Sequence, residues 1–252
     1  MKYNFLKETE DGTVLYNKND TYVGKSIATY GRYQLEELKL FDKYIQKGDT
    51  VIDVGANIGT HTLWFANKVG ADGFVYAFEP QRLLFQTLCA NLALNSIQNV
   101  DCRQLGAGYS QRIIKVPFLD PTKENNFGGL NIEGHSEGEK VAICRLDDIG
   151  LTRCAFIKID VEGMEPEVLQ GAMNTIVECR PVLYLELEKD ENVEFLQALL
   201  EELKYKADMH TPPLYSDDYG GENVFGETTS KNVLAIPGGH RLWQHGKSLR
   251  EI

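Results

Sequence analysis

Two hydrophobic periods alternate along this chain, and their alternation predicts its fold class. Short runs of Val, Ile, Leu and Phe, about four to eight residues long, are typical of buried strands. Between these runs, apolar residues recur about every three or four positions, as they do on the inner face of an amphipathic helix. Strands that alternate with helices in this way predict an α/β fold, with a doubly wound, mostly parallel sheet and helices on both faces.

The same pattern gives each element an expected place. Buried strands are expected at residues 51–54, 73–78, 100–105, 155–160 and 181–188, with 204–209 and 232–237 as a closing pair. Helices are expected at 31–45, from Thr60 onward, and at 81–95, 166–176 and 193–203, with Asp190 as the cap of the last one. Together these elements are interpreted as one large domain.

Both ends of the chain depart from this alternation. Residues 1–24 have a hairpin-like pattern, in which short apolar groups are separated by turn residues. Residues 1–30 are therefore interpreted as an N-terminal extension and 31–237 as the main domain. Residues 238–252 lack a clear period and are interpreted as a tail that is surface or disordered.

The middle of the chain also departs from it. Extended stretches at 112–119 and 141–146 flank residues 121–140, which are polar and rich in glycine. Long loops inside a compact domain are often functional. Residues 126–140 are therefore predicted to be a lid on the acceptor side of an active site, with a mobile surface excursion as the alternative.

The strongest chemical signal is the stretch VIDVGANIGTHTLWFA, which joins a buried strand to a helix. Gly55 and Gly59 allow a tight turn, and the first N–H groups of the helix point toward a ligand. A dinucleotide-binding turn has glycine at the middle position, where this chain has Asn57, and a pyrophosphate would be crowded there. A ligand whose amino and carboxylate groups bond Asp53 and the turn amides fits better. S-adenosylmethionine (SAM) is such a ligand.

Residues beyond the turn complete the expected cofactor site. Glu79 ends the second strand, twenty residues after Gly59, where an acidic side chain can accept hydrogen bonds from both ribose hydroxyls. Pro80 follows it and favours a helix start, and Gly106 follows the third strand near the expected adenine. His61 lies in the first turn of the helix, where capping, packing and ligand contact all stay open.

Three acidic residues are candidates for the chemistry. Asp160, Glu162 and Glu186 follow the expected fourth strand or belong to the fifth, so they should cluster at one edge of a parallel sheet. Such carboxylates could act as a base or bind an acceptor, although helix capping or solvation would also explain each of them. No ligand spacing demands a metal, but Asp160 and Glu186 could hold a divalent cation. His135 and His210 fall in polar loops and are expected to be solvated.

Composition excludes several other functions. The net charge of −11 and the pI near 5.0 argue against nucleic acid as a partner. The five cysteines are widely spaced and form no C-x-x-C pair, which fits reduced thiols in a cytoplasmic protein and argues against structural zinc. Neither a signal peptide nor a membrane span is evident. The expected partner is a small-molecule or glycan acceptor, and the oligomeric state stays open.

The chain resembles the FkbM family of SAM-dependent methyltransferases, a class I Rossmann-like group, over roughly residues 31–237. The resemblance rests on VIDVGANIG, FEP, FIKIDVEGMEPEVLQGA and NVLAIP, which occur in family order. It implies a seven-stranded sheet whose last strand is antiparallel, SAM as the methyl donor, and the hydroxyl of a sugar or polyketide-like molecule as acceptor. Family members often have Glu after an aromatic before the first strand, whereas this chain has Gln34, which could still bond the methionine end of SAM.

The residues thus favour a SAM-dependent O-methyltransferase. A nicotinamide-dependent oxidoreductase would explain the turn and Glu79, but the chain lacks the three-glycine spacing of a dinucleotide fingerprint. A catalytically inactive SAM-binding module would keep the fold and need not keep the acidic cluster. Binding of SAM compared with NAD separates the first two alternatives, and turnover of the donor tests the third.

Overall fold

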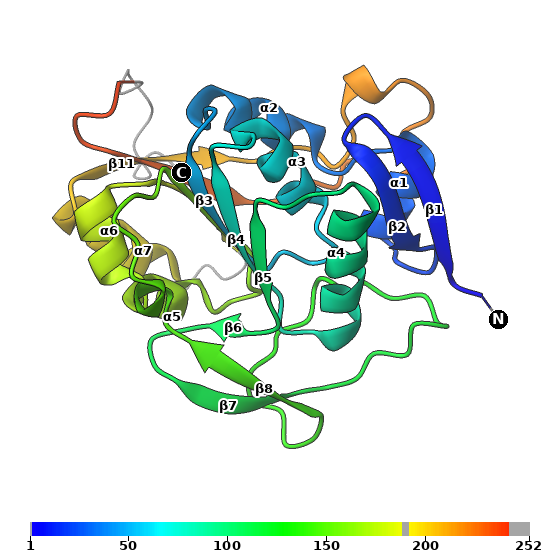
Figure 1. The fold of residues 1–252 in the computed structure, drawn as a ribbon, viewed down its shortest axis with the longest axis horizontal. Coiled ribbons are helices and arrows are strands. Elements are labelled where there is room, and N and C mark those ends of the chain that lie inside the picture. The colour runs from blue at the N-terminus through cyan, green and yellow to red at the C-terminus, as the bar shows by residue number, and fades with distance from the viewer. Residues whose placement is uncertain (1, 188–191, 242–252) are drawn as a thin grey trace.

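The computed structural model describes residues 2–187 and 192–241, and it is built around one seven-stranded sheet (Figure 1). The strand order is β11-β12-β10-β9-β3-β4-β5. Their bounds are β3 Thr50–Val54, β4 Phe74–Phe78, β5 Val100–Arg103, β9 Phe156–Ile159, β10 Val182–Glu186, β11 Tyr205–His210 and β12 Asn232–Pro237. Strand β12 runs antiparallel to both of its neighbours, and the other pairings are parallel. The sheet predicted from the sequence is therefore confirmed.

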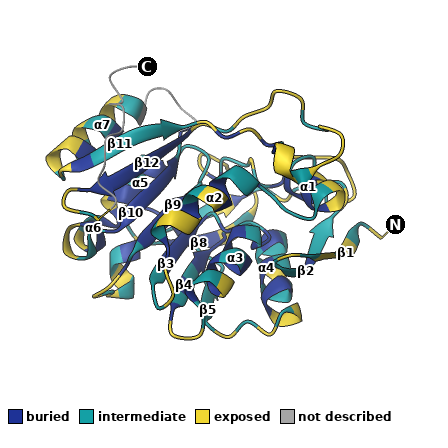
Figure 2. Cartoon of the chain, turned by 90° about the horizontal axis from the view of Figure 1, so that it is seen from above, coloured by how far each residue is buried: buried dark blue, intermediate teal, exposed yellow. Residues whose placement is uncertain are grey.

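Helices cover both faces of the sheet because successive residues of a strand point to opposite sides. On β3, Ile52 and Val54 pack against helices α5, α6 and α7, whereas Val51 packs against α2 and α3. The helices are α2 Leu35–Tyr44, α3 Thr60–Val69, α4 Arg82–Leu94, α5 Glu165–Gln170, α6 Met173–Cys179 and α7 Asn192–Glu202. Figure 2 shows the central strands β9, β10 and β12 as buried, with exposed residues on the outer helix faces and loops. None of the described helices is long and apolar enough to cross a lipid bilayer.

Two smaller units flank the main sheet. An antiparallel hairpin, β1 Asn4–Thr9 with β2 Gly12–Asn17, lies beside α4 (Figure 1). Side-chain amides fasten it there, since Asn91 Oδ1 accepts a hydrogen bond from the Leu15 N–H at 2.6 Å. A second sheet has the order β6-β8-β7, with β6 Gly106–Ala107, β7 Arg112–Val116 and β8 Glu139–Cys144. The two extended stretches predicted in the middle of the chain thus pair with each other.

Two helical predictions were incomplete. Residues 1–30 contain a helix, α1 Val23–Tyr30, after the hairpin. The single helix expected at 166–176 is two helices, α5 and α6, which break at Gly171. A Cβ at Gly171 would lie 2.0 Å from the carbonyl oxygen of Gly108, so only glycine fits at this junction. Asp147 then caps α6 by accepting a hydrogen bond from the Thr175 N–H at 2.9 Å.

Some predictions fall outside the described residues. The capping role of Asp190 and the end of the strand expected at 181–188 lie there, as does most of the predicted tail at 238–252. The first turn of α5 contains Pro166, as its fixed φ angle predicts.

Candidate functional site

One face of the sheet carries a patch of polar side chains that an ordinary core would exclude. On the face covered by α2 and α3, Asp53 of β3, Lys158 of β9 and Tyr184 of β10 lie in register across neighbouring strands. All three side chains are buried. Buried charges are costly unless they are paired or hydrogen-bonded, so this patch sets the face apart from an ordinary core.

A cavity opens at the carboxyl ends of β3, β4, β9 and β10, and with its mouth it encloses about 1340 Å³ of space between atoms. This is the edge where ligands bind in open α/β sheets. The predicted site residues that line it are Gln34, Gly55, Asn57, His61, Glu79, Pro80, Gly106, Asp160, Glu162 and Glu186.

The turn after β3 has the backbone shape that its glycines predict. Gly55 has a φ of 80°, and a Cβ there would lie 1.7 Å from the carbonyl oxygen of Asp160, so only glycine fits. Gly59 has a φ of 85° and begins α3, and it shapes the turn without lining the cavity. Asn57 adopts a φ of 54°, a conformation that Asn tolerates better than most residues. The turn is thereby held in one shape before any ligand arrives.

Glu79 is tied to this turn by backbone hydrogen bonds. Its Oε2 accepts from the Asn57 N–H at 2.8 Å, and its Oε1 accepts from the Gln81 N–H at 2.7 Å. Burial raises the pKa of Glu79 to about 7, although these two hydrogen bonds oppose the shift. The carboxyl group is therefore fixed in place at the cavity wall and titrates near neutral pH.

Asp53 lies behind the cavity wall and does not line it. It is fully buried, its Oδ2 accepts a hydrogen bond from Thr62 Oγ1 at 2.6 Å, and its Oδ1 lies 3.9 Å from Lys158 Nζ. Burial raises its pKa, and Lys158 opposes that shift. Asp53 therefore links α3 and β9 to β3. A ligand in the cavity would contact the neighbours of Asp53 rather than Asp53 itself.

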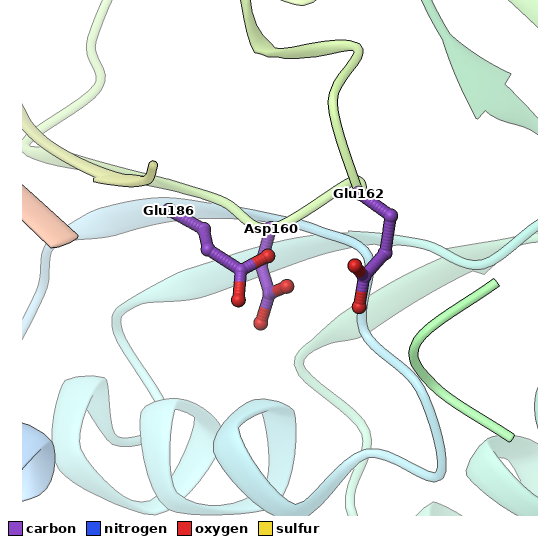
Figure 3. A group of neighbouring side chains, drawn as sticks. All are labelled: Asp160, Glu162 and Glu186. Carbon is purple, nitrogen blue, oxygen red and sulfur yellow. The ribbon is translucent and has the colours of Figure 1, made fainter. Parts of the chain in front are cut away.

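Asp160, Glu162 and Glu186 come together as the sequence predicted (Figure 3). Lys158 Nζ donates to Asp160 Oδ2 at 2.8 Å. Burial alone would raise the pKa of Asp160, but Lys158 and a hydrogen bond with Glu186 hold it below its usual value. Burial and the neighbouring Asp160 raise the pKa of Glu186 to about 11. At neutral pH the pair is thus an ionised Asp160 beside a protonated Glu186.

The three carboxyl groups are close enough to share a cation, since one ligand atom from each lies within 4.8 Å of the others. However, Lys158 already supplies a positive charge to Asp160. Asp160 and Asp53 in turn raise the pKa of Lys158 above its usual value, although its burial opposes this. A divalent cation would have to compete with this lysine and remove the proton of Glu186, so the cluster is not assigned as a metal site.

His61 and Gln34 occupy the side of the cavity next to α2. His61 is buried, and its Nε2 lies 3.3 Å from Glu37 Oε2. Burial, and then the charge of Lys158, lower the pKa of His61 to about 3, so its ring is neutral. Gln34 is buried with a φ of 53°, and its Oε1 has no hydrogen-bond partner. That oxygen is an acceptor available to a donor group of a ligand.

The predicted lid divides into two parts. Its first part lines the cavity through Asn126, Gly128, Gly129, Leu130 and Ile132, whereas residues 133–139 do not line it. The Phe127 carbonyl accepts a hydrogen bond from Gln81 Nε2 at 2.8 Å, so this part lies against the residues next to Glu79. The loop therefore adjoins the predicted cofactor residues, and the opposite wall is formed by Leu214 and residues 228–230.

Sequence reasoning missed Lys158, Glu37 and Tyr184. Glu37 lines the cavity from α2, and Tyr184 lies behind it on β10. A signal for Lys158 was present, because a lysine between isoleucines in a fully buried strand is rare unless it is paired. His210 was expected to be solvated in a loop, but it ends β11, and its Nδ1 lies 2.8 Å from the Tyr184 hydroxyl.

Comparison with known proteins agrees with this geometry. Residues 53–207 match the family described as the methyltransferase FkbM domain. The chain is 27% identical over 143 residues to Methyltransferase 1 of Beauveria bassiana, a match that covers 48% of this chain and 57% of that protein. It is 26% identical over 179 residues to the hexuronic acid methyltransferase AglP of Haloferax volcanii, covering 71% of this chain and 72% of that protein.

A solved structure shares the fold. The crystal structure of methyltransferase FkbM from Methylobacillus flagellatus matches with a TM-score of 0.51 at 19% identity, covering 78% of this chain and 50% of that one. At this identity the match concerns the fold alone. The chain spans little more than half the length of Methyltransferase 1, so the match covers only part of that relative.

Proposed function

This chain belongs to the FkbM family of methyltransferases, and on that premise we propose that it transfers a methyl group from SAM to a hydroxyl group of a sugar, a glycan or a similar small molecule. The family implies SAM as the donor. The observation that carries the proposal for the chemistry is the pairing of Asp160 with Lys158 and Glu186 at the cavity edge.

The residues that line the cavity fit SAM. Glu79 is a fixed carboxyl group of the kind that binds ribose hydroxyls, and Gly106 lines the same cavity together with the apolar Leu105 and Ile132, which suit a flat base. Gln34 offers a buried oxygen without a partner, which suits an ammonium group. We assign the ribose to Glu79 and the methionine end to the turn at residues 53–59, where Gln34 could bond it as well. When bound, SAM supplies an electrophilic methyl group on a positively charged sulfur.

Asp160 is the group that would handle the acceptor hydroxyl. Its side chain is 37% exposed toward the cavity mouth, while Lys158 and Glu186 hold its carboxylate in position. An ionised Asp160 can accept the hydrogen bond of the hydroxyl, orient its oxygen and take the proton as the new C–O bond forms. A carboxylate is a weak base for an alcohol, so orientation accounts for much of the proposed effect.

The acceptor class rests on the family and one relative. AglP is by name a hexuronic acid methyltransferase, and a sugar acceptor fits a cavity whose walls offer carboxyl, amide and hydroxyl groups as hydrogen-bond partners. Glu162 lines the same part of the cavity and would contact a second hydroxyl of the acceptor.

Asp160→Asn tests the chemistry. The substitution keeps the shape of the side chain but removes its charge and its ability to accept a proton. We expect turnover to fall by about 10²- to 10⁴-fold, with little change in SAM affinity. The measurement is transfer of labelled methyl from SAM to a panel of simple glycosides and glucuronic acid, with calorimetry for SAM binding. The control is Asp148→Asn, an exposed aspartate whose partner is Gln111.

The outcomes separate the alternatives. Near-normal turnover in Asp160→Asn would mean that Asp160 has a structural role. The same experiment would then be carried out on Glu162 and Glu186. Binding of NAD in preference to SAM would favour the oxidoreductase. SAM binding without transfer to any acceptor would favour an inactive binding module.

A further inference from the structure

Glu37 is a buried carboxyl group that neither the predicted cofactor contacts nor the acceptor chemistry uses. It projects from α2 to the cavity wall and is only 4% exposed. Its Oε1 is approached by three polar groups from two other strands and the preceding loop: the Tyr184 hydroxyl at 3.1 Å, Asn232 Nδ2 at 3.2 Å and Ser230 Oγ at 3.5 Å. A carboxyl group enclosed in this way is held in one place and is supported when it is ionised.

Tyr184 extends the hydrogen-bonded contact of Glu37 away from the cavity. Its hydroxyl lies 2.8 Å from Nδ1 of His210 as well as 3.1 Å from Glu37. The ring is fully buried and packs edge-on against Phe41, with centroids 4.8 Å apart, so the hydroxyl stays between its two partners. His210 is half-buried at the end of β11, the edge strand of the sheet. The three groups thus form a continuous hydrogen-bonded path from the cavity wall to the edge of the sheet.

The bonding capacity of the hydroxyl gives this path two states. A tyrosine hydroxyl has one hydrogen to donate and can accept in return. When Glu37 is ionised, the hydroxyl donates to it and accepts from Nδ1–H of His210. When Glu37 is protonated, it can donate to the hydroxyl, which then donates to an unprotonated Nδ1. The two states differ in which end of the path holds the proton.

We propose that Glu37, Tyr184 and His210 conduct a proton from the cavity to the edge of the sheet. The O–H bond of Glu37 breaks as one forms on the Tyr184 oxygen, the original Tyr184 O–H breaks as N–H forms at His210 Nδ1, and the imidazolium then gives its Nε2 proton to water. Rotation of the hydroxyl and exchange of the imidazole tautomer reset the path. Tyr184 and His210 carry the proton in this scheme, and neither of them lines the cavity.

SAM supplies a reason for the proton to move. Burial raises the pKa of Glu37 to about 7, with Lys158 opposing the shift and Asp160 adding to it. A sulfonium and an ammonium group entering the cavity favour the ionised carboxyl, so binding should expel a proton. Each O-methyl transfer would release another, and that part of the inference rests on the proposed function.

Other charged groups near the path set the pH range over which it can carry a proton. The groups that face Glu37 are His61 from α3, Lys158 and Asp160 from β9 and its end, and Tyr184 from β10. Those near His210 are Glu36 and Lys43 from α2, in addition to Tyr184. Burial lowers the pKa of His210. The imidazolium therefore gives up its proton readily near neutral pH, as an exit group must.

The experiment mixes SAM with the full chain in weak buffer at about pH 6.5 and follows proton release with an indicator dye in stopped flow. We expect Tyr184→Phe and His210→Ala to slow the release by roughly tenfold or more while its amplitude persists. Glu37→Gln should remove part of the amplitude, since Glu79 also titrates near neutral pH. Controls are Tyr205→Phe, which loses a buried hydrogen bond to the Pro181 carbonyl, and His135→Gln in an exposed loop.

The outcomes are distinct. Release at the wild-type rate in Tyr184→Phe, or at full amplitude in Glu37→Gln, would overturn the path. NMR titration of His210 without SAM is a second test, because Glu37 should add an inflection near pH 7 that Glu37→Gln and Tyr184→Phe both abolish. An absent inflection in the wild type would overturn the path too. If the path passes these tests but no acceptor is methylated, the proposed function fails and the path stands.

Discussion

The two sides of the cavity hold their carboxyl groups by different means. On the side of β4, Glu79 is fixed by two backbone N–H groups, from Asn57 in the turn after β3 and from Gln81, two residues along the chain. On the side of β9 and β10, Asp160 and Glu37 are held by side chains, such as Lys158 and Tyr184. The first side is a rigid template made by backbone groups. The second is an interdependent network that exists only after the whole sheet has formed.

This difference predicts how each side of the cavity responds to substitutions. A backbone-held carboxyl group keeps its position when distant residues vary, which suits a donor molecule that is the same in every turnover. A network of side chains can shift its protons and partners, which suits a step that handles a proton and an acceptor. Substitutions should therefore have local effects on the first side and effects that spread on the second.

Lys158→Met should have the largest effect on stability. It removes the cation that faces Asp160 and the fully buried Asp53, and breaking a buried ion pair costs about 3–5 kcal/mol of unfolding free energy. Urea denaturation at pH 7 measures this loss. The matched control, Lys39→Met, removes an exposed lysine with two carboxylate partners, and solvent screening should make its loss of stability far smaller. Equal losses in the two variants would contradict the network.

Glu79→Gln should affect SAM binding next. Loss of charge-assisted hydrogen bonds costs on the order of 1.5–3 kcal/mol, which corresponds to roughly tenfold or more in affinity. The amide also turns its NH₂ toward one of the two backbone N–H groups, so a modest local loss of stability is expected. Calorimetry measures the affinity, and Glu139→Gln, a partly buried partner of Arg82, is the control. Unchanged affinity in a folded variant would remove Glu79 from the cofactor site.

Glu37→Gln should change how stability depends on pH. The pKa of Glu37 is about 7 in the folded chain against an ordinary value of 4.5, so the folded state binds a proton that the unfolded state does not. The stability from this proton is fully present below about pH 4.5 and is lost as pH rises through about 7. Thermal unfolding without SAM should show the melting temperature of the variant rising relative to wild type between pH 5 and 8.

Glu36→Gln is the control for that trend. Lys39 and Ser216 lower the pKa of Glu36, so its contribution is present above its ordinary pKa and is lost only as pH falls. Its difference from wild type should stay flat between pH 5 and 8. A flat difference for Glu37→Gln as well would mean that this carboxyl group is ionised throughout.

Trimming residues 134–138 should have the smallest effect. These residues do not line the cavity, so both SAM affinity and turnover should stay within about twofold of wild type. Gly128→Val, in the part of the loop that lies against Asn57, should weaken SAM binding by a few fold, because its Cβ would lie 2.3 Å from Asn57 Nδ2. A large loss of turnover with unchanged SAM binding in the trimmed variant would restore the prediction of an acceptor-side lid.

The sequence predicted those features whose causes are local. The seven strands follow from apolar runs, and the strand-end position of Glu79 and the tight turn at Gly55 follow from spacing and from the φ angles that glycine allows. Asp160 and Glu186 could be placed together because parallel strands end at the same edge of a sheet. Their grouping is confirmed, whereas their catalytic role stays a prediction.

The remaining features depend on contacts between distant segments. Glu37 appears in the sequence as one more acidic residue on a helix, and nothing local indicates that it faces Tyr184 and Asn232 from the far end of the chain. Asp53 was predicted to touch the ligand, yet it lies behind the wall because its side of β3 faces Thr62. The need for glycine at position 171 likewise depends on Gly108, more than sixty residues earlier.

Strand β12 has a consequence for biosynthesis. It is the last strand of the sheet in chain order, yet it inserts between β10 and β11, and it carries Asn232 to Glu37. While the ribosome is still making residues 188–231, β10 has an unpaired edge and the polar groups behind the cavity lack part of their enclosure. Pairings so distant in sequence form late, and an open strand edge in a nascent chain invites wrong partners. A stalled or truncated translation product that lacks β12 would therefore expose the edge of β10.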